Sequence, residues 1–253
     1  MAMVLMVAMV VGMGTMTYAR YVTQAGMPNA ESATVADWGY VLTINSANLF
    51  GKQYEGNVVN ESFVANDEGN DEIDVKTVGE ADIVAPGSGG SMTITVSGNA
   101  EVLAQLAIAV DNAATKDVVL VYKTAADGAE STYNPIKWTL TKKVGTAAAT
   151  TVGTAGTTLA NIVSSLQSQG SKIEAGTSIE ETVYTLSWTW DINASMDVAD
   201  DTNEKDTALG MLAAGKSAEQ IKAATGLIVV TGEGKTNTTL SVKISASIVQ
   251  IQD

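Results

Sequence analysis

Apolar and polar residues alternate along much of this chain, and this period of two restricts most strongly what it can fold into. The alternation is strict in residues 91–97 and recurs in residues 136–142 and 182–190. Successive side chains of a strand point to opposite faces, so these segments predict strands with one buried face. Further strands are expected at residues 38–44, 72–78, 102–110, 118–123 and 240–248. Many short strands of this kind favour an all-β protein built as a β-sandwich.

Helices are expected to be few and short. An apolar spacing of i, i+3, i+4 and i+7 predicts one helix, ended by Gly170, with its core positions at Leu159, Ile162, Val163 and Leu166. A second short helix is expected to start at Asp206 or Thr207 as its N-cap and to end at Gly215. Such helices would connect strands of the sandwich.

A third helix begins where the sequence also matches a nucleotide-binding motif. Ser217 and Gln220 form a capping box for a helix that Gly226 ends. Residues 210–217 read G-x-x-x-x-G-K-S, the letters of a P-loop. A P-loop must follow a buried strand, whereas the charged residues 200–206 precede this match. We therefore interpret it as a helix, a glycine stop and a capped second helix.

Composition excludes several classes of function. The 253 residues include neither histidine nor cysteine, so disulfides, the usual zinc, haem and copper sites and histidine-based catalytic triads cannot be built. The net charge of −14 disfavours nucleic acid as a partner. No residue is expected to be catalytic and no cofactor is expected.

The first residues have the character of a secretory leader. Residues 1–19 carry no charge, and small residues occupy Thr17 and Ala19, the −3 and −1 positions of a cut after Ala19. The apolar run is short for a membrane span. A basic n-region is missing. The alternative interpretation is an uncleaved anchor or a pilin-type hydrophobic helix. We expect a cleaved leader, a secreted chain, and membrane contact only through the uncleaved leader.

Two groups of residues could bind ligands. Asp197, Asp200 and Asp201 crowd one acidic loop and are weak candidates for calcium, but the EF-hand spacing is absent and a solvated loop is the favoured interpretation. The four tryptophans could form a sugar-binding platform. Because they lie in alternating strands, we expect them in the core, at Trp38, Trp138, Trp188 and Trp190.

Short motifs spread over most of the chain resemble the TasA/camelysin family of secreted proteins. They begin with the leader ending Gly-Thr-Met-Thr-Tyr-Ala and with Arg-Tyr-Val-Thr-Gln at residues 20–24. They continue with Ser-Ala-Thr-Val-Ala-Asp-Trp at 32–38, Val-Ala-Pro-Gly-Ser-Gly-Gly-Ser at 84–91, Tyr-Asn-Pro-Ile-Lys-Trp at 133–138 and Leu-Ser-Trp-Thr-Trp at 186–190.

The resemblance implies a jelly-roll β-sandwich whose leader is cut by a dedicated signal peptidase of the SipW type. It also implies polymerisation into extracellular fibres of a biofilm matrix, in which the N-terminal strand of one subunit inserts into the sheet of the next. The corresponding assembly residues are Arg20, Tyr21, Val22 and Thr23. Camelysin members are often labelled metallopeptidases, but a zinc site would need histidine, which this chain lacks.

Together these observations predict a signal peptide at residues 1–19, an extended donor segment at 20–36 and one jelly-roll domain at 37–253. The expected function is that of a secreted, structural homopolymer of the extracellular matrix or cell surface. The alternatives are a monomeric cell-surface module that binds carbohydrate or calcium, and a camelysin-like peptidase.

Overall fold

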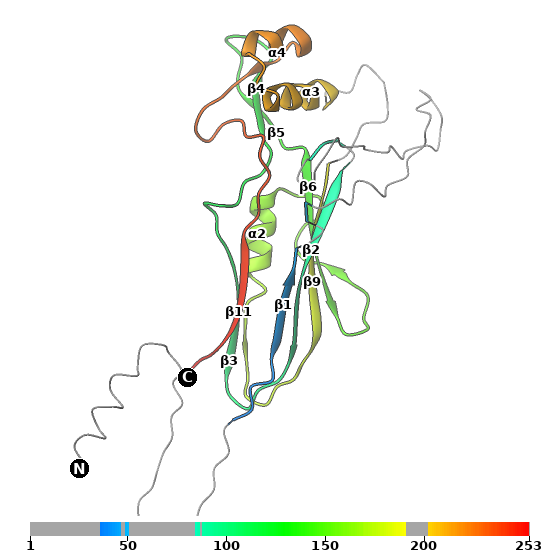
Figure 1. Cartoon of the computed structure of the whole chain (residues 1–253), viewed down its shortest axis with the longest axis vertical. Helices are drawn as coiled ribbons and strands as arrows, with labels where there is room; N and C mark the ends of the chain where they lie inside the picture. Colours follow the sequence, from blue (N-terminus) through cyan, green and yellow to red (C-terminus); the bar gives the residue numbers. More distant parts are fainter. Residues whose placement is uncertain (1–35, 47–48, 51–83, 87, 191–201, 253) are drawn as a thin grey trace, which may run out of the picture. The chain divides into compact units, whose positions relative to one another are not determined.

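Antiparallel strands are the main regular structure of the computed structural model, which describes residues 36–46, 49–50, 84–86, 88–190 and 202–252 (Figure 1). The largest sheet has the order β1-β2-β9-β6-β7. Its strands are β1 (Val41–Asn45), β2 (Gly89–Gly98), β9 (Ile179–Trp190), β6 (Ile136–Val144) and β7 (Thr150–Thr151). The expected strands at 91–97, 136–142 and 182–190 are confirmed, and they form the centre of this sheet. The expected strand at 72–78 lies outside the described residues.

The described residues form two further antiparallel sheets, each of three strands. The first has the order β11-β3-β8, formed by β11 (Ile244–Gln250), β3 (Ala104–Val110) and β8 (Ser171–Ile173). The second has the order β10-β4-β5, formed by β10 (Ile228–Val229), β4 (Leu120–Lys123) and β5 (Ser131–Tyr133). The prediction of an all-β protein with a few short helices is thus confirmed.

One hydrophobic core joins the sheets, and the alternating pattern determines which side chains enter it. On β6, Ile136, Trp138 and Leu140 are at most 1% exposed, whereas Lys137 between them is exposed. The same alternation runs along β9 and β3, whose inward residues belong to the same core. Burying a side chain of this size stabilises the fold by about 1.5–3 kcal/mol. The period of two therefore creates the buried face of each sheet.

Helix α2 (Leu159–Gln167) packs against both β6 and β3 and buries its predicted apolar residues, except Val163, which is half-buried. The expectation that Gly170 ends it was wrong, because Ser168 is the C-cap. Gly170 has another role. A Cβ atom there would lie 3.0 Å from the carbonyl oxygen of Leu106, so glycine permits the close approach of β3.

Helices α3 (Thr202–Ala213) and α4 (Ala218–Thr225) follow one another near β4 and β5 (Figure 1). The expected cap at Asp206 or Thr207 was wrong, because both residues lie inside α3. The capping box of Ser217 and Gln220 is confirmed. The preceding helix explains the P-loop-like letters, because Gly210 is helical and Ser217 is the N-cap of α4.

The C-terminal strand begins later than expected. Residues 240–243 precede β11 and are held instead by the segment before β4. Ser241 pairs with Lys116, and Asn237 pairs with Val119, each through an isolated bridge. The same segment is tied down by the side chain of Thr236, which accepts from the Val121 amide at 2.9 Å. The polar residues at 236–239 thus join the end of the chain to β4 before β11 starts.

Two glycines of the P-loop-like stretch should respond oppositely to alanine. Gly210→Ala should raise the free energy of unfolding by about 0.5–1 kcal/mol, because its Cβ would meet nothing within 4 Å and alanine favours a helix. Gly215→Ala should lower it by about 1–2 kcal/mol, because Gly215 has φ +71°. Urea unfolding of both variants tests this; equal effects of the same sign would contradict the helix–stop–helix interpretation.

Candidate assembly site

The residues predicted to act in assembly lie outside the described residues. This holds for Arg20, Tyr21, Val22 and Thr23. It holds also for the weak calcium candidates Asp197, Asp200 and Asp201. The structure does describe the surface that an added strand would need, namely the edges of the five-stranded sheet and of the β11-β3-β8 sheet.

Two of these edges, β1 and β11, come close to each other. Among the described residues, β1 pairs only with β2 and β11 pairs only with β3. We call these two edges and their inward-facing side chains the open side of the core. The opposite side differs, because there α2 packs against both β6 and β3.

Inward-facing side chains are poorly covered along β1. Leu42 is opposite Val96 and Ile44 is opposite Ile94, so each pair shares one face of the sheet. Val96 is 1% exposed and Ile94 is 3% exposed, yet Ile44 is 40% exposed and Leu42 is half-buried. The inward-facing side chains are therefore fully covered on β2 and only partly covered on its neighbour β1.

Burial of the inward-facing side chains falls in the same way from β3 to β11. Ile244, Ala246 and Ile248 of β11 are only half-buried. Their partners across the pair are fully buried, in the order Val110, Ile108 and Leu106. Both edges of the open side therefore carry apolar rows that the described residues do not cover.

Backbone groups on these edges also point outward. The backbone carbonyl of Lys243 accepts from the Asp111 amide, and the Ile251 amide donates to the Leu103 carbonyl. Odd-numbered residues of β11 therefore direct their backbone groups toward β3. The alternation of an antiparallel strand then directs the N–H groups of Ile244, Ala246 and Ile248 away from β3. On β1, Gly39 donates to Asn99, which by the same rule leaves the backbone of Leu42 and Ile44 pointing outward.

A polar group on the open side also lacks a partner. The hydroxyl of Tyr40 is buried and has no hydrogen-bond partner among the described residues. Trp38 packs edge-on against the Tyr40 ring, 5.3 Å between centroids, and is itself 42% exposed. The expectation that all four tryptophans lie in the core is therefore confirmed for Trp138, Trp188 and Trp190 but was wrong for Trp38.

Two partly buried aspartates tie other segments to the core tryptophans. Asp206 accepts from the Tyr133 hydroxyl at 2.8 Å and from the Trp190 indole at 3.1 Å, which joins α3 to β5 and β9. Asp117 accepts from the Trp138 indole at 3.3 Å and from the Leu159 amide at 3.2 Å, and so caps α2. Burial raises the pKa of both carboxyls above the ordinary value, although these hydrogen bonds act in the opposite direction.

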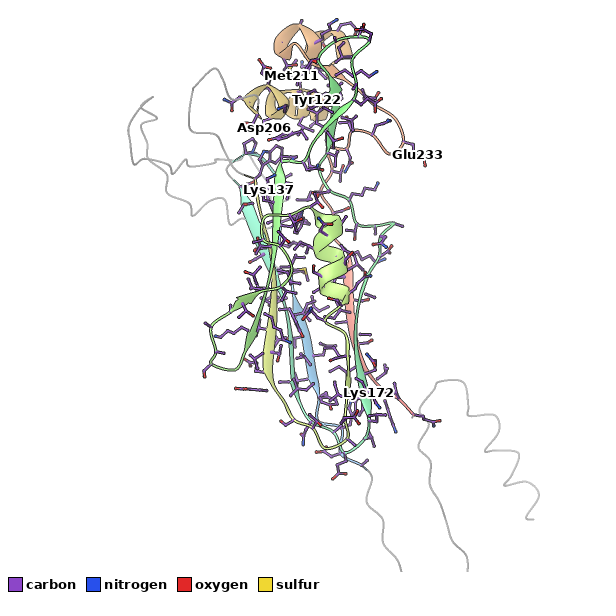
Figure 2. All side chains as sticks on the ribbon, turned by 180° about the vertical axis from the view of Figure 1, so that it is seen from behind. Tyr122, Lys137, Lys172, Asp206, Met211 and Glu233 are labelled. Carbon is purple, nitrogen blue, oxygen red and sulfur yellow. The ribbon has the colours of Figure 1, made fainter. Side chains whose placement is uncertain are left out.

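Lys205, beside Asp206, adds a second attachment of α3. Its ammonium lies 5.6 Å from the centre of the Tyr122 ring and 5.7 Å from that of Tyr133. Figure 2 labels Tyr122 and Asp206 where α3 meets β4. Such cation–π contacts contribute about 0.5–1 kcal/mol each when exposed. The polar contacts around Asp206 thus have a structural role, which is to hold α3 in place.

The described residues include no group of three or more acidic, histidine or cysteine side chains placed to hold a metal ion. Within the same part of the chain, no helix has the length and apolar character that a membrane crossing requires. Comparison of the chain with protein-family models, curated proteins and solved structures finds no match.

The open side was missed by sequence reasoning, although part of its signal is visible. The alternation in residues 38–44 and 240–248 predicts strands but does not say which strands end a sheet. Edge position depends on pairings between residues far apart in the chain, such as Ile248 with Leu106. Asp117 was missed too, because its partners are brought together only by folding.

Asp206 should make stability depend on pH. Its raised folded-state pKa means that the folded protein holds the proton more tightly, so the stabilisation is full below pH 3.8, the unfolded value, and is lost as pH rises through the folded pKa. Asp206→Asn retains an acceptor oxygen and cannot ionise. The variant should therefore gain stability over wild type as pH rises from 3 to 7, measured by urea unfolding.

Asp206→Ala is the matched control, because it removes the acceptor as well as the charge. It should destabilise at every pH by about 1–3 kcal/mol for each buried donor left unpaired. If Asp206→Asn followed the wild-type pH dependence throughout, Asp206 would not be the titrating group.

Proposed function

We propose that this protein is a secreted structural subunit, folded as a jelly-roll β-sandwich, that polymerises into extracellular filaments by donor-strand exchange. The observation that carries the proposal is the pair of half-buried apolar rows on β1 and β11. Two antiparallel sheets around one core, with the chain passing between them from β2 to β3 and from β8 to β9, support the jelly roll. The resemblance to the TasA/camelysin family points to the same architecture.

The acceptor is assigned to the edge of β11. This strand has seven residues against five in β1, so it offers the longer row of outward backbone groups. A strand added there would pair with the amides of Ile244, Ala246 and Ile248. Its side chains would cover the inward rows of both edge strands. Strand addition of this kind uses main-chain hydrogen bonds for affinity and side-chain burial for specificity.

The donor is assigned to residues 20–36 of a neighbouring copy, with Tyr21 and Val22 as apolar anchors flanked by Arg20 and Thr23. Ordering a free tail costs about 1–2 kcal/mol per residue, so hydrogen bonds alone do not suffice. Burial of Tyr21 and Val22, and of the rows they would cover, supplies the remaining stabilisation at about 25 cal/mol per Å² of apolar surface. The half-buried rows are therefore central to the mechanism.

Secretion follows from the leader. We infer that a signal peptidase cuts after Ala19 and that the mature chain lies in the extracellular matrix or on the cell surface. Partners are copies of the same chain, without nucleic acid and without a cofactor. N-terminal sequencing of the secreted protein should begin at Arg20; material that retained residues 1–16 would contradict the cleavage.

One rival retains a specific observation in its favour. A monomeric carbohydrate-binding module would use exposed aromatic rings, and Trp38 is exposed beside Tyr40. Trp38 lies next to β1, where a donor strand would also cover it. A camelysin-like peptidase has no such support, because the chain lacks the histidine that a zinc site of that class would use.

Proline at position 246 should block the acceptor. The amide of Ala246 points away from β3, so Ala246→Pro removes a group needed by the incoming strand while it leaves the pairing with β3 intact. We expect a folded monomer and no filaments by negative-stain microscopy. Ala246→Ser retains the amide and should assemble like wild type. Filaments from the proline variant would contradict acceptance at β11.

Mixing experiments separate the donor from the acceptor. Val22→Asp should also abolish filaments, because a buried unpaired carboxylate is costly. The proline variant keeps its donor segment and the Val22→Asp variant keeps its acceptor edge. Small amounts of either should therefore shorten wild-type filaments by terminating growth, whereas the two variants mixed should stop at dimers. Variants that left wild-type filament length unchanged would show that subunits join through other surfaces.

A further inference from the structure

The outer face of the five-stranded sheet has an unusual composition. Across β6, β9 and β2, one row consists of Thr139, Ser187 and Ser91, and the next consists of Thr141, Thr185 and Thr93. These residues are half-buried and point away from the core, because the residues between them are the buried ones. We call these two rows and the row on either side of them the hydroxyl face.

The flanking rows extend the same chemistry. Thr189 lies opposite Lys137 at one end, and Thr95 lies opposite Val183 at the other, where Lys143 completes the row. Among the described residues paired in these four rows, only the two lysines, Val183, Asn45 of β1 and Gly89 lack a hydroxyl. Regular strand geometry spaces its side chains about 4.8 Å apart between strands and about 6.7 Å apart along them.

The charge of this face is opposite to that of the protein. The chain has 28 acidic residues and only 14 basic ones, yet the four rows contain lysines and no carboxylate. At the Val183 end, the next described residue of β9 on this face is the acidic Glu181, which lies beside the β-bulge of β2. Lys137 and Lys143 are both exposed, and Lys137 is labelled on β6 in Figure 2. A polyanion repelled elsewhere can approach here.

We propose that the hydroxyl face binds an acidic polysaccharide, that is, a chain of sugars carrying carboxylates. Serine and threonine hydroxyls both donate and accept hydrogen bonds, as sugar hydroxyls do. The lysines supply the ion pairs with carboxylates, which should weaken with salt because both ammonium groups are exposed. Aromatic stacking has no part, because Trp138, Trp188 and Trp190 face the core.

Nucleic acid is the less suitable polyanion. Its phosphates are bound chiefly through many lysine and arginine contacts, and this face has two lysines among a much larger number of hydroxyls. The site is independent of the open side, since it occupies the outward face of the sheet rather than its edge. Binding is therefore expected of the secreted chain whether or not it has polymerised.

Binding of soluble polygalacturonate by the full secreted chain at low salt tests the site, with neutral dextran and duplex DNA as comparison probes. The double variant Lys137→Gln/Lys143→Gln should weaken binding roughly twofold to thirtyfold, as expected for two exposed ion pairs. The matched control Lys216→Gln/Lys222→Gln makes the same change in net charge on exposed residues of the α3–α4 region and should bind like wild type.

A variant that gains binding is a further test, because misfolding can explain a loss of binding but not a gain. Thr189→Lys adds an exposed cation beside Lys137 and should tighten polygalacturonate binding severalfold, whereas Ser247→Lys on the other sheet should not. Dextran should bind far more weakly than polygalacturonate. The proposal would be overturned if polygalacturonate did not bind at low salt, or if the two double variants lost the same affinity. It would also be overturned if DNA bound as tightly as polygalacturonate and depended equally on Lys137 and Lys143.

Discussion

Coverage of the inward-facing apolar rows is the constraint on which this fold depends. The central strands β2, β9, β6 and β3 meet it fully, because each has neighbours on both sides and a sheet or helix above. At one side α2 supplies the cover for β6 and β3. At the open side the described residues leave Ile44 and the inward row of β11 incompletely buried. An incomplete core of this kind favours acceptance of a further strand.

Indole N–H groups impose a second requirement, which determines how the segments around the core are held in place. Each buried tryptophan needs an acceptor, because an unpaired buried donor costs about 1–3 kcal/mol. Trp188 donates to the carbonyl of Leu49 at 2.8 Å, while Trp138 and Trp190 donate to Asp117 and Asp206. These bonds fix the segment after β1, the start of α2 and the middle of α3. The aromatic core thus holds together segments that lie far apart in the sequence.

The sequence was most informative where one local pattern decides the structure. The strict alternation of β2 and the capping box of α4 predict both elements correctly because each depends on neighbouring residues. The start of α3 was missed because Asp206 looked like a cap, whereas its partners Tyr133 and Trp190 come from distant strands. The edges β1 and β11 and the hydroxyl face could not be predicted, since both arise from the order of strands in a sheet.

Hydrogen exchange of monomers and filaments tests the central claim most directly. The amides of Ile244, Ala246 and Ile248 point away from β3 and should exchange rapidly in the monomer. In filaments the account predicts that these three amides become strongly protected, together with residues 20–36 of the donor segment, while the central strands β2 and β9 stay protected in both states. Filaments in which the β11 amides still exchange as fast as in the monomer would contradict assembly by donor-strand exchange at this edge.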